Sequence, residues 1–291
     1  MTLFQPDLGE HGSLYSTIRD SGQQNNVAAR DLCNQLWAQF EPLADDHFTQ
    51  EFARNFHSRF WEMDLTTALM NIGLDIACPK PGPDICISNN GNRIWVEAIT
   101  PTRGDGADRI PDEPEEGVYQ VPGDQIALRL TAAIDSKNRV HLEYLENGIC
   151  LQEEPYVIAI NGCLLFGYGL DLDPPRIATV LFSIGNQYVS ICRESGEVAG
   201  RGYQCNPNVA KVSGAEIPTD IFLNEAYSNI SGVIFSGASV GNRPEHVGQE
   251  YVFVHNPYAS NPVVEGLVPL GRECIADMVS DTEFRLRWNV Y

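Results

Sequence analysis

The chain has 291 residues, of which 43% are hydrophobic and 20% are charged, and this composition excludes a disordered or fibrous protein. Its 19 basic and 39 acidic side chains give a formal net charge of −20. That charge argues against a general polyanion-binding protein, because such proteins neutralise phosphates with many Lys and Arg side chains. It does not exclude a local basic groove or a metal-bridged phosphate site.

The N-terminal residues and the cysteines predict the compartment of the protein. The first residues contain neither a basic segment nor an apolar segment of the secretory type, so we expect no signal peptide and a cytoplasmic protein. No apolar run approaches the length of a membrane span, so no membrane partner is expected. The eight cysteines form no CxxC pair and no zinc-ligand spacing, which favours reduced thiols used as small hydrophobic side chains.

The N-terminal part is predicted to be helical after a polar start. Residues 1–24 are polar and predict an irregular arm. Apolar residues at helical spacing predict a helix over residues 27–40 and a second helical stretch from Phe48 to Ile72, in which Phe recurs at every fourth position. Gly73 is a plausible end for that stretch.

The middle of the chain alternates strands and helices. Three strands are predicted at residues 74–78, 84–89 and 93–100. The Asn90-Gly91 pair between the last two is a strong hairpin signal. Residues 103–124 are rich in Gly, Asp, Glu and Pro and predict a loop. A long helix over residues 126–145 and a fully buried strand over residues 156–161 follow.

The remainder is predicted to be rich in strands. Strands are expected at residues 177–184, 230–236 and 251–255, with one helical stretch near residues 220–229. No Pro/Gly/Ser linker separates two halves. We therefore expect a single domain made of an N-terminal arm and helix (1–47), an α/β core (48–161) and a β-rich extension packed on that core (162–291).

The predicted hairpin brings two carboxylates together. If Asn90-Gly91 forms a two-residue loop, the pairing of the flanking strands places Asp84 directly opposite Glu97. Opposed side chains share one face of the sheet, with Cβ atoms roughly 4.5–5.5 Å apart, and like charges there are destabilising. A cation such as Mg²⁺ or Mn²⁺ between them relieves the repulsion. The alternatives are that an arginine neutralises the pair or that the register slips.

These elements resemble the αβββαβ core of the PD-(D/E)XK nuclease superfamily. The resemblance covers roughly residues 48–161, and the segments that carry it are Arg-Phe-Trp-Glu ending at Glu62, Gly82-Pro83-Asp84 and Trp95-Val96-Glu97-Ala98. The same segments resemble a bacterial branch that lacks the superfamily's usual lysine. The fold implied is α/β, with a restriction-endonuclease-like αβββαβ core and a mixed sheet, elaborated by the β-rich C-terminal region. The resemblance also implies that Asp84 and Glu97 bind Mg²⁺ and that Glu62 is the third ligand.

The departure from the superfamily concerns its catalytic lysine. That lysine is expected two residues after the glutamate, where this chain has Ile99. By the resemblance, a neighbouring element can supply the cation, and Lys137 on the following helix is favoured. Arg129 on the same helix stays protonated and is better suited to clamp a phosphate. Lys80, in the turn before Asp84, is a further candidate for this cation. Gln125, near the start of the helix, could hold a water in place of a cation. A surface lysine on an amphipathic helix is the alternative interpretation of Lys137.

Two other patterns are weighed and set aside. Gly237 to Gly241 matches the GxSxG pattern, with His246 and His255 downstream, but a nucleophile elbow requires a helix directly after the serine and residues 242–248 have no helical period. The acidic side chains of the central loop lack the spacing of a calcium-binding EF-hand and predict a solvated loop that repels nucleic acid; they are Asp105, Asp108, Asp112, Glu113, Glu115 and Glu116.

Two functional hypotheses result. The first is Mg²⁺-dependent hydrolysis of nucleic acid, with DNA as the substrate that the resemblance implies. The second is a catalytically inactive nuclease fold that acts as an acidic binding or assembly module, with a protein partner or a second copy of the chain. Ile99 and the net charge of −20 favour the second hypothesis.

Overall fold

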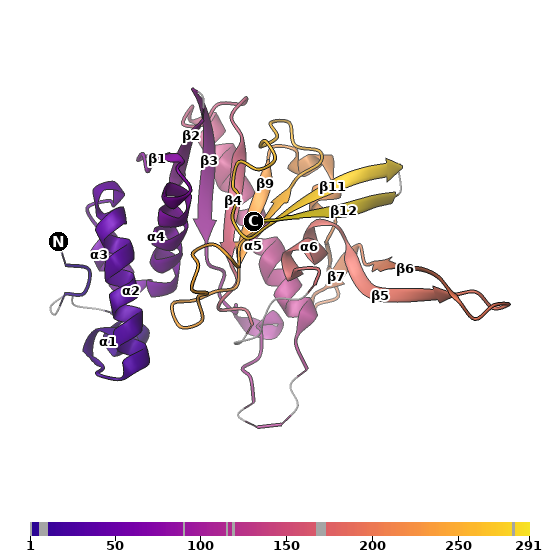
Figure 1. Ribbon diagram of the computed structural model, residues 1–291, viewed down its shortest axis with the longest axis horizontal. Helices are drawn as coiled ribbons and strands as arrows, with labels where there is room; N and C mark the ends of the chain where they lie inside the picture. Colours follow the sequence, from indigo (N-terminus) through magenta and orange to yellow (C-terminus); the bar gives the residue numbers. More distant parts are fainter. Residues whose placement is uncertain are drawn as a thin grey trace.

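A mixed eight-stranded sheet, in the order β1-β2-β3-β4-β9-β10-β11-β12, runs through the molecule (Figure 1). The computed structural model describes residues 2–5, 11–89, 91–114, 116–117, 120–166, 173–280 and 283–291. The helices are α1 (Ser13–Asp20), α2 (Gln24–Phe40), α3 (Phe48–Arg54), α4 (Phe56–Asn71), α5 (Gly123–Glu146) and α6 (Arg176–Leu181). Short 3₁₀ helices are η1 (Glu41–Leu43), η2 (Gly106–Asp108), η3 (Ile221–Leu223) and η4 (Glu225–Tyr227).

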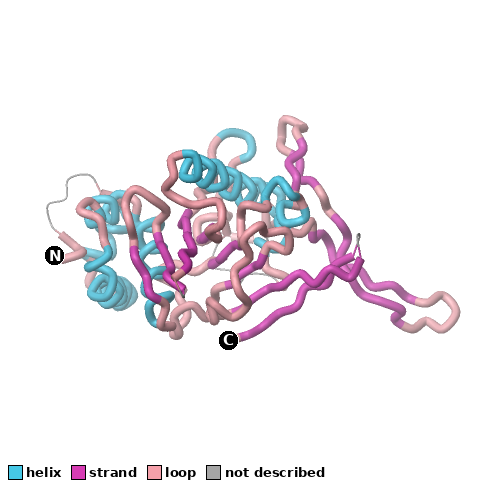
Figure 2. Tube along the Cα trace, turned by 90° about the horizontal axis from the view of Figure 1, so that it is seen from above, coloured by secondary structure: helices cyan, strands magenta, loops and turns pink. Residues whose placement is uncertain are grey.

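The strands divide between the large sheet and two small hairpins. Those of the large sheet are β1 (Asp75–Ala77), β2 (Ile85–Asn89), β3 (Asn92–Ile99), β4 (Tyr156–Asn161), β9 (Gly232–Ser236), β10 (Val252–His255), β11 (Arg272–Ser280) and β12 (Glu283–Val290). The hairpins are formed by β5 (Ile184–Ile191) with β6 (Val198–Cys205) and by β7 (Asn208–Ala210) with β8 (Glu216–Pro218). Figure 2 shows the β5–β6 hairpin extending away from the body of the molecule.

The elements α4, β1, β2, β3, α5 and β4 follow in the αβββαβ order that the sequence predicts. Strands β1, β2 and β3 are antiparallel, and β3, β4 and β9 are parallel. Because β9 pairs with β4, the region from residue 162 onward contributes strands to the same sheet. The fold is therefore mixed α/β, with a mixed sheet that spans both the core and the C-terminal extension.

The two faces of the sheet are covered by different helices. On one face, Trp61 and Leu65 of α4 pack against Val96 of β3. On the other face, apolar residues of α5 such as Leu130 pack in one cluster with Trp95 of β3. Neighbouring residues of β3 therefore alternate between the α4 side and the α5 side, as the two-residue period of a strand requires.

The β2–β3 hairpin has the predicted register. Its Cα partners run from Asn89 with Asn92 to Ile85 with Val96. Gly91 has φ of 83°, a left-handed conformation that glycine adopts without strain. Asn90 lies outside the described residues. The register prediction is confirmed, and one step beyond its last pair lie Asp84 and Glu97.

Four predictions, in the N-terminal part and in the C-terminal half, differ from the structure. The arm expected over residues 1–24 contains helix α1, with Tyr15 and Ile18 buried. The stretch from Phe48 to Ile72 is two helices, because Asn55 between them has non-helical φ of −120° and ψ of 52°.

Residues 177–184, expected as a strand, are mostly α6, whose apolar side chains are buried. A short apolar run does not by itself distinguish a buried strand from a buried helix. The helix expected near residues 220–229 is the pair of 3₁₀ helices η3 and η4.

Two further findings concern the helices and the cysteines. Within the described ranges, no helix is both long and apolar enough to cross a membrane. All eight cysteines are free thiols, four of them buried.

A buried carboxylate joins the last strands of the sheet. Glu273 of β11 is 0% exposed, and its two oxygens accept hydrogen bonds from the Gly266 N–H, Asn289 Nδ2 and the Tyr291 hydroxyl. His255 Nε2 lies 2.8 Å from Oε1 of the same carboxylate. Burial alone would raise the pKa of Glu273, but these hydrogen bonds, beginning with that of Gly266, outweigh burial and lower it to about 2.

We expect Glu273→Gln to reduce the free energy of unfolding at pH 7 by about 2–4 kcal/mol, because it removes a buried charged acceptor. A carboxyl group whose pKa is lower in the folded protein than in the unfolded chain stabilises the fold at pH values above its pKa in the unfolded chain. This contribution to stability is lost as the pH falls toward 2. The difference between variant and wild type should therefore shrink on acidification. Urea denaturation at pH 7 and pH 3 measures this, with exposed Glu283→Gln on β12 as control. Equal losses at the two pH values would contradict it.

Candidate functional site

Asp84 lies at the point where β2 begins. It follows the Pro81-Gly82-Pro83 turn and directly precedes Ile85, the last β2 residue paired with β3. Its Oδ2 accepts a hydrogen bond from the Ala98 N–H of β3 at 2.9 Å. The carboxylate therefore continues the strand pairing by one step and is fixed beside β3.

Glu97 lies on the α5 side of β3 and is only 5% exposed. Lys137 of α5 donates a hydrogen bond from Nζ to Glu97 Oε1 at 2.6 Å. The backbone carbonyl of Lys137 accepts a hydrogen bond from the Tyr156 hydroxyl of β4, which ties this turn of α5 to the sheet. Glu97 Oε2 is buried and has no hydrogen-bond partner.

The electrostatics of Glu97 are unusual for a carboxylate. Burial first, and then the nearby Asp84 charge, raise its pKa, the Lys137 ammonium opposes both effects, and the resulting pKa is about 7. Near neutral pH, Glu97 is thus held between its protonated and ionised forms. Its free Oε2 is an atom that a proton, a water or a cation would satisfy.

The cations that neutralise the two carboxylates come from separate elements. Lys137 of α5 pairs with Glu97, and Lys80 of the turn before β2 lies 3.4 Å from Asp84 Oδ1. The Lys80 side chain is 43% exposed, whereas that of Lys137 is 19% exposed. The structure therefore brings together four of the predicted site residues: Asp84, Glu97, Lys80 and Lys137.

Glu62 of α4 lies near this group but is paired elsewhere. Its Oε2 accepts a hydrogen bond from Arg59 Nη1 at 2.7 Å, and the same guanidinium lies 3.5 Å from Asp45. Burial raises the pKa of Glu62, the Asp84 charge adds to this, and Arg59 opposes it. In the part of the chain that the structure describes, no three His, Cys, Asp or Glu side chains form a metal-binding group. A ligand role for Glu62 stays a prediction.

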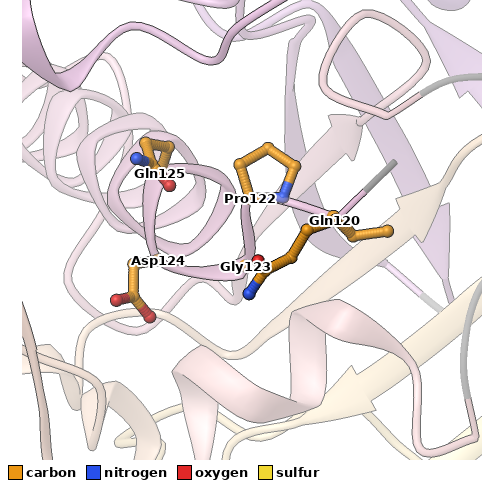
Figure 3. A pocket seen from close by; sticks show the side chains of 6 residues that line it. Gln120, Pro122, Gly123, Asp124 and Gln125 are labelled. Carbon is orange, nitrogen blue, oxygen red and sulfur yellow. The ribbon is translucent and has the colours of Figure 1, made fainter. Parts of the chain in front are cut away.

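Arg129 and Gln125 lie farther along α5. Arg129 Nε donates a hydrogen bond to the Thr102 carbonyl and so holds the segment after β3. Gln125 lines a shallow pocket at the first turn of α5 (Figure 3). At 1.5 Å per residue, these side chains lie about 12 and 18 Å before Lys137 along the helix axis. They do not join the Asp84–Glu97 group.

Two residues of the site were missed by the sequence analysis. Arg59 is three positions before Glu62, a spacing that puts two side chains side by side on a helix. Tyr144 is seven positions after Lys137, on the same face of α5, and its hydroxyl donates to the Gly82 carbonyl at 3.3 Å. Burial raises the pKa of Tyr144, and the charges of Glu97 and then Asp84 raise it further.

Residues of the two patterns that were set aside, the GxSxG segment and the acidic loop, are bonded to neighbouring side chains. No helix follows Ser239, and its hydroxyl donates to Asn242 Oδ1, so the GxSxG segment is not a nucleophile elbow. In the acidic loop, Asp112 pairs with Arg103 and Arg109. Glu115 of that loop lies outside the described residues.

The donor set fits a divalent cation in part. Two carboxylates on neighbouring strands, with one buried oxygen unpaired, match the one or two protein carboxylates that Mg²⁺ uses beside waters and phosphate oxygens. No protein-family model matches the chain, and no curated protein or solved structure is significantly similar to it.

Proposed function

We propose that the protein hydrolyses phosphodiester bonds of nucleic acid at the Asp84–Glu97 pair, with Mg²⁺ or Mn²⁺ as cofactor, as a restriction-endonuclease-like enzyme. The observation that carries the proposal is the contact of Lys137 Nζ with Glu97 Oε1 at 2.6 Å. Through this contact, helix α5 supplies a cation beside Glu97. In the superfamily that the sequence resembles, the cation is a lysine two residues after the glutamate, where this chain has Ile99. DNA is the expected substrate.

Asp84 and Glu97 would hold the cation. When bound, the cation would polarise the phosphate and activate a water. Hydrolysis joins the water oxygen to phosphorus, breaks one ester P–O bond and delivers a proton to the departing alkoxide. The ammonium of Lys137 has three N–H donors and uses one on Glu97, so the others can orient the water and a phosphate oxygen. The more exposed Lys80 can pair with a substrate phosphate.

One observation favours the inactive binding module as a second candidate. Lys80 and Lys137 already pair with the two carboxylates, so the repulsion between Asp84 and Glu97 is offset in part without a metal. An acidic surface with an internally paired site suits a basic protein partner.

The two candidates are separated by a cleavage assay joined to a binding assay. Purified protein should cleave DNA or RNA with Mg²⁺ or Mn²⁺ and stop on addition of a chelator, and Asp84→Asn should cleave none. Mn²⁺ binding is measured by calorimetry on wild type and on Asp84→Asn. Metal binding at the pair without cleavage of any nucleic acid would favour the binding module. Absence of both would contradict the metal site itself.

A further inference from the structure

The turn that leads into Asp84 has few backbone hydrogen-bond donors of its own. It reads Pro79-Lys80-Pro81-Gly82-Pro83, and its three prolines carry no N–H. Its backbone therefore depends on packing and on side chains from other elements. Gly82 packs closely against such elements, since a Cβ at this position would lie 3.4 Å from Ile149 Cγ2 and 3.7 Å from Trp95 Cζ3.

Tyr144 of α5 reaches this turn with its hydroxyl. The hydroxyl donates a hydrogen bond to the Gly82 carbonyl at 3.3 Å. Apolar packing is non-directional, whereas a hydrogen bond orients the peptide whose oxygen accepts it. Burial raises the pKa of Tyr144, and the charges of Glu97 and then Asp84 raise it further, so the hydroxyl keeps its proton and remains a donor.

The hydrogen-bonded carbonyl lies close to Asp84 along the chain, because it belongs to the peptide between Gly82 and Pro83. That peptide is planar, and the ring of Pro83 fixes its φ at about −65°. The ψ of Pro83 is therefore the single soft dihedral between the anchored peptide and the Cα atom of Asp84. From the other side, the Ala98 N–H donates to Asp84 Oδ2 at 2.9 Å.

Helix α5 thus contacts both halves of the carboxylate pair. Lys137 donates a hydrogen bond to Glu97 at 2.6 Å. Tyr144 follows two helical turns later on the same face, about 10 Å along the axis, and bonds to the segment before Asp84. Because one helix makes both contacts, it links the position of Asp84 to that of Glu97.

We infer that Tyr144 is a positioning residue of the proposed metal site: its hydroxyl holds Asp84 in place relative to Glu97, so that both carboxylates can bind one cation. The inference rests on the proposed function and adds to it a residue that acts through the backbone of Gly82. Tyr144 takes no part in the proton transfers of the reaction.

Amide exchange in the metal-free protein tests the positioning directly. Tyr144→Phe keeps the ring and removes the hydroxyl, so exchange at Ala98, whose N–H bonds the Asp84 carboxylate, should become at least about fivefold faster. Exchange at Trp95, whose N–H bonds the Pro155 carbonyl, should not change. Tyr227→Phe is the matched control, because it also removes a half-buried hydroxyl that bonds to α5, at Asp135.

Metal binding and cleavage provide the second readout. The Mn²⁺ affinity of Tyr144→Phe, measured by calorimetry, should fall about tenfold, because loss of a group that orients a metal ligand commonly costs about 10–100-fold in affinity or activity. The kcat for nucleic acid should fall by a similar factor while KM stays within about twofold. A tyrosine that only stabilises the fold would lower Tm and leave the Mn²⁺ affinity and the exchange at Ala98 unchanged.

Failure of this inference is distinguishable from failure of the proposed function. If wild type binds Mn²⁺, unchanged affinity or unchanged Ala98 exchange in Tyr144→Phe overturns the inference and leaves the proposed function standing. A wild type that neither binds Mn²⁺ nor cleaves nucleic acid overturns the proposed function. Exchange at Ala98, measured without metal, still decides in that case whether Tyr144 positions Asp84.

Discussion

Glu97→Gln should abolish metal-dependent cleavage, with a loss of at least about 10³-fold in kcat, while the metal-free protein becomes as stable as wild type or more stable. The substitution keeps the shape of a side chain that is 5% exposed, but it removes the charge that would hold the cation. Lys137, its partner, keeps access to solvent and tolerates the loss of its counter-ion.

The stability change should depend on pH, with a sign set by the raised pKa of Glu97. Burial first, and then Asp84, raise that pKa to about 7, so the folded state binds the proton more tightly than the unfolded chain does. Wild type therefore loses stability as pH rises from about 4.5 to 7, and Glu97→Gln does not. The variant should gain up to about 3 kcal/mol at pH 8.5 and almost nothing at pH 4.5.

Urea denaturation in chelator at both pH values measures this difference. Glu146→Gln on the exposed side of α5 is the control for loss of one acidic charge. A variant that cleaves nucleic acid at the wild-type rate, or one that is less stable than wild type at pH 8.5, would show that Glu97 is a structural ion-pair partner and not a ligand.

The hairpin is the part of the site that the sequence determines most directly. The Asn90-Gly91 loop signal sets the register of the flanking strands, and that register puts Asp84 and Glu97 one step beyond the last backbone pair. The long apolar periodicity of α5 and the uninterrupted apolar run of β4 also predict the bounds of those two elements to within a few residues. Local patterns suffice here because the partners are adjacent in sequence.

The contact of α5 with the sheet depends on long-range packing and is not encoded in a local pattern. Lys137 and Arg129 are two helical turns apart and both were candidates. The hydroxyl of Tyr156 on β4 contacts the turn of α5 at Lys137, so Lys137 meets Glu97 while Arg129 reaches the Thr102 carbonyl. Sequence spacing does not report where along its length a helix crosses a strand.

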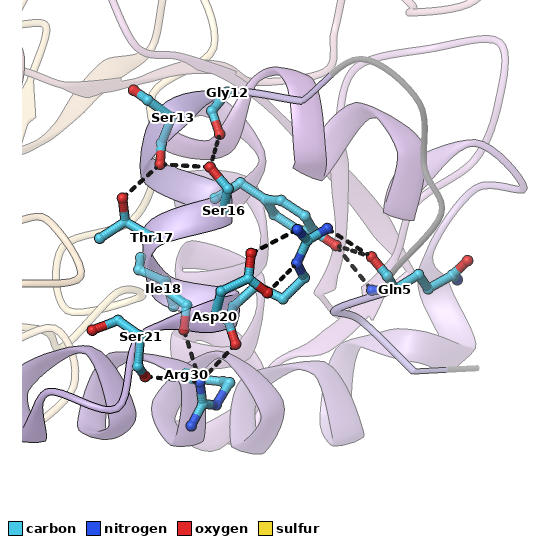
Figure 4. Close-up of polar contacts among 11 residues, drawn as sticks. Gln5, Gly12, Ser13, Ser16, Thr17, Ile18, Asp20, Ser21 and Arg30 are labelled. Carbon is cyan, nitrogen blue, oxygen red and sulfur yellow. Dashed lines mark hydrogen bonds and ion pairs between the residues drawn. The ribbon is translucent and has the colours of Figure 1, made fainter.

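The N-terminal segment was missed for a related reason. Its polar composition gives no sign of the short helix α1. The C-terminal end of α1 is fixed by a residue of the next helix, because Arg30 of α2 donates hydrogen bonds to the carbonyls of Ile18, Arg19 and Ser21 (Figure 4). Tyr15 is buried against Phe4 and Phe52. An eight-residue helix is marginal alone, and these tertiary contacts stabilise it.

Lys137→Ala should lower the cleavage rate by about 10²–10⁴-fold, the usual contribution of a group that assists proton transfer at the reacting centre. Arg129→Ala should change the rate by less than about threefold, because its guanidinium holds a loop carbonyl and lies about 12 Å from Lys137 along α5. This pair of variants tests which of the two cations assists the proposed reaction. A loss in Arg129→Ala with normal activity in Lys137→Ala would reverse the assignment.

Lys137→Ala should also change the stability of the protein, in the direction opposite to Glu97→Gln. Removing the ammonium leaves the buried Glu97 carboxylate without its partner, so its pKa rises further above the ordinary value and the ionised form becomes more costly. In chelator, Lys137→Ala should therefore be less stable than wild type above pH 8 and close to wild type at pH 4.5, where Glu97 is protonated in both proteins. The double variant Lys137→Ala with Glu97→Gln should recover the lost stability but not the activity. That combination separates the ion pair from catalysis, since a purely structural lysine would lose stability in Lys137→Ala without losing cleavage.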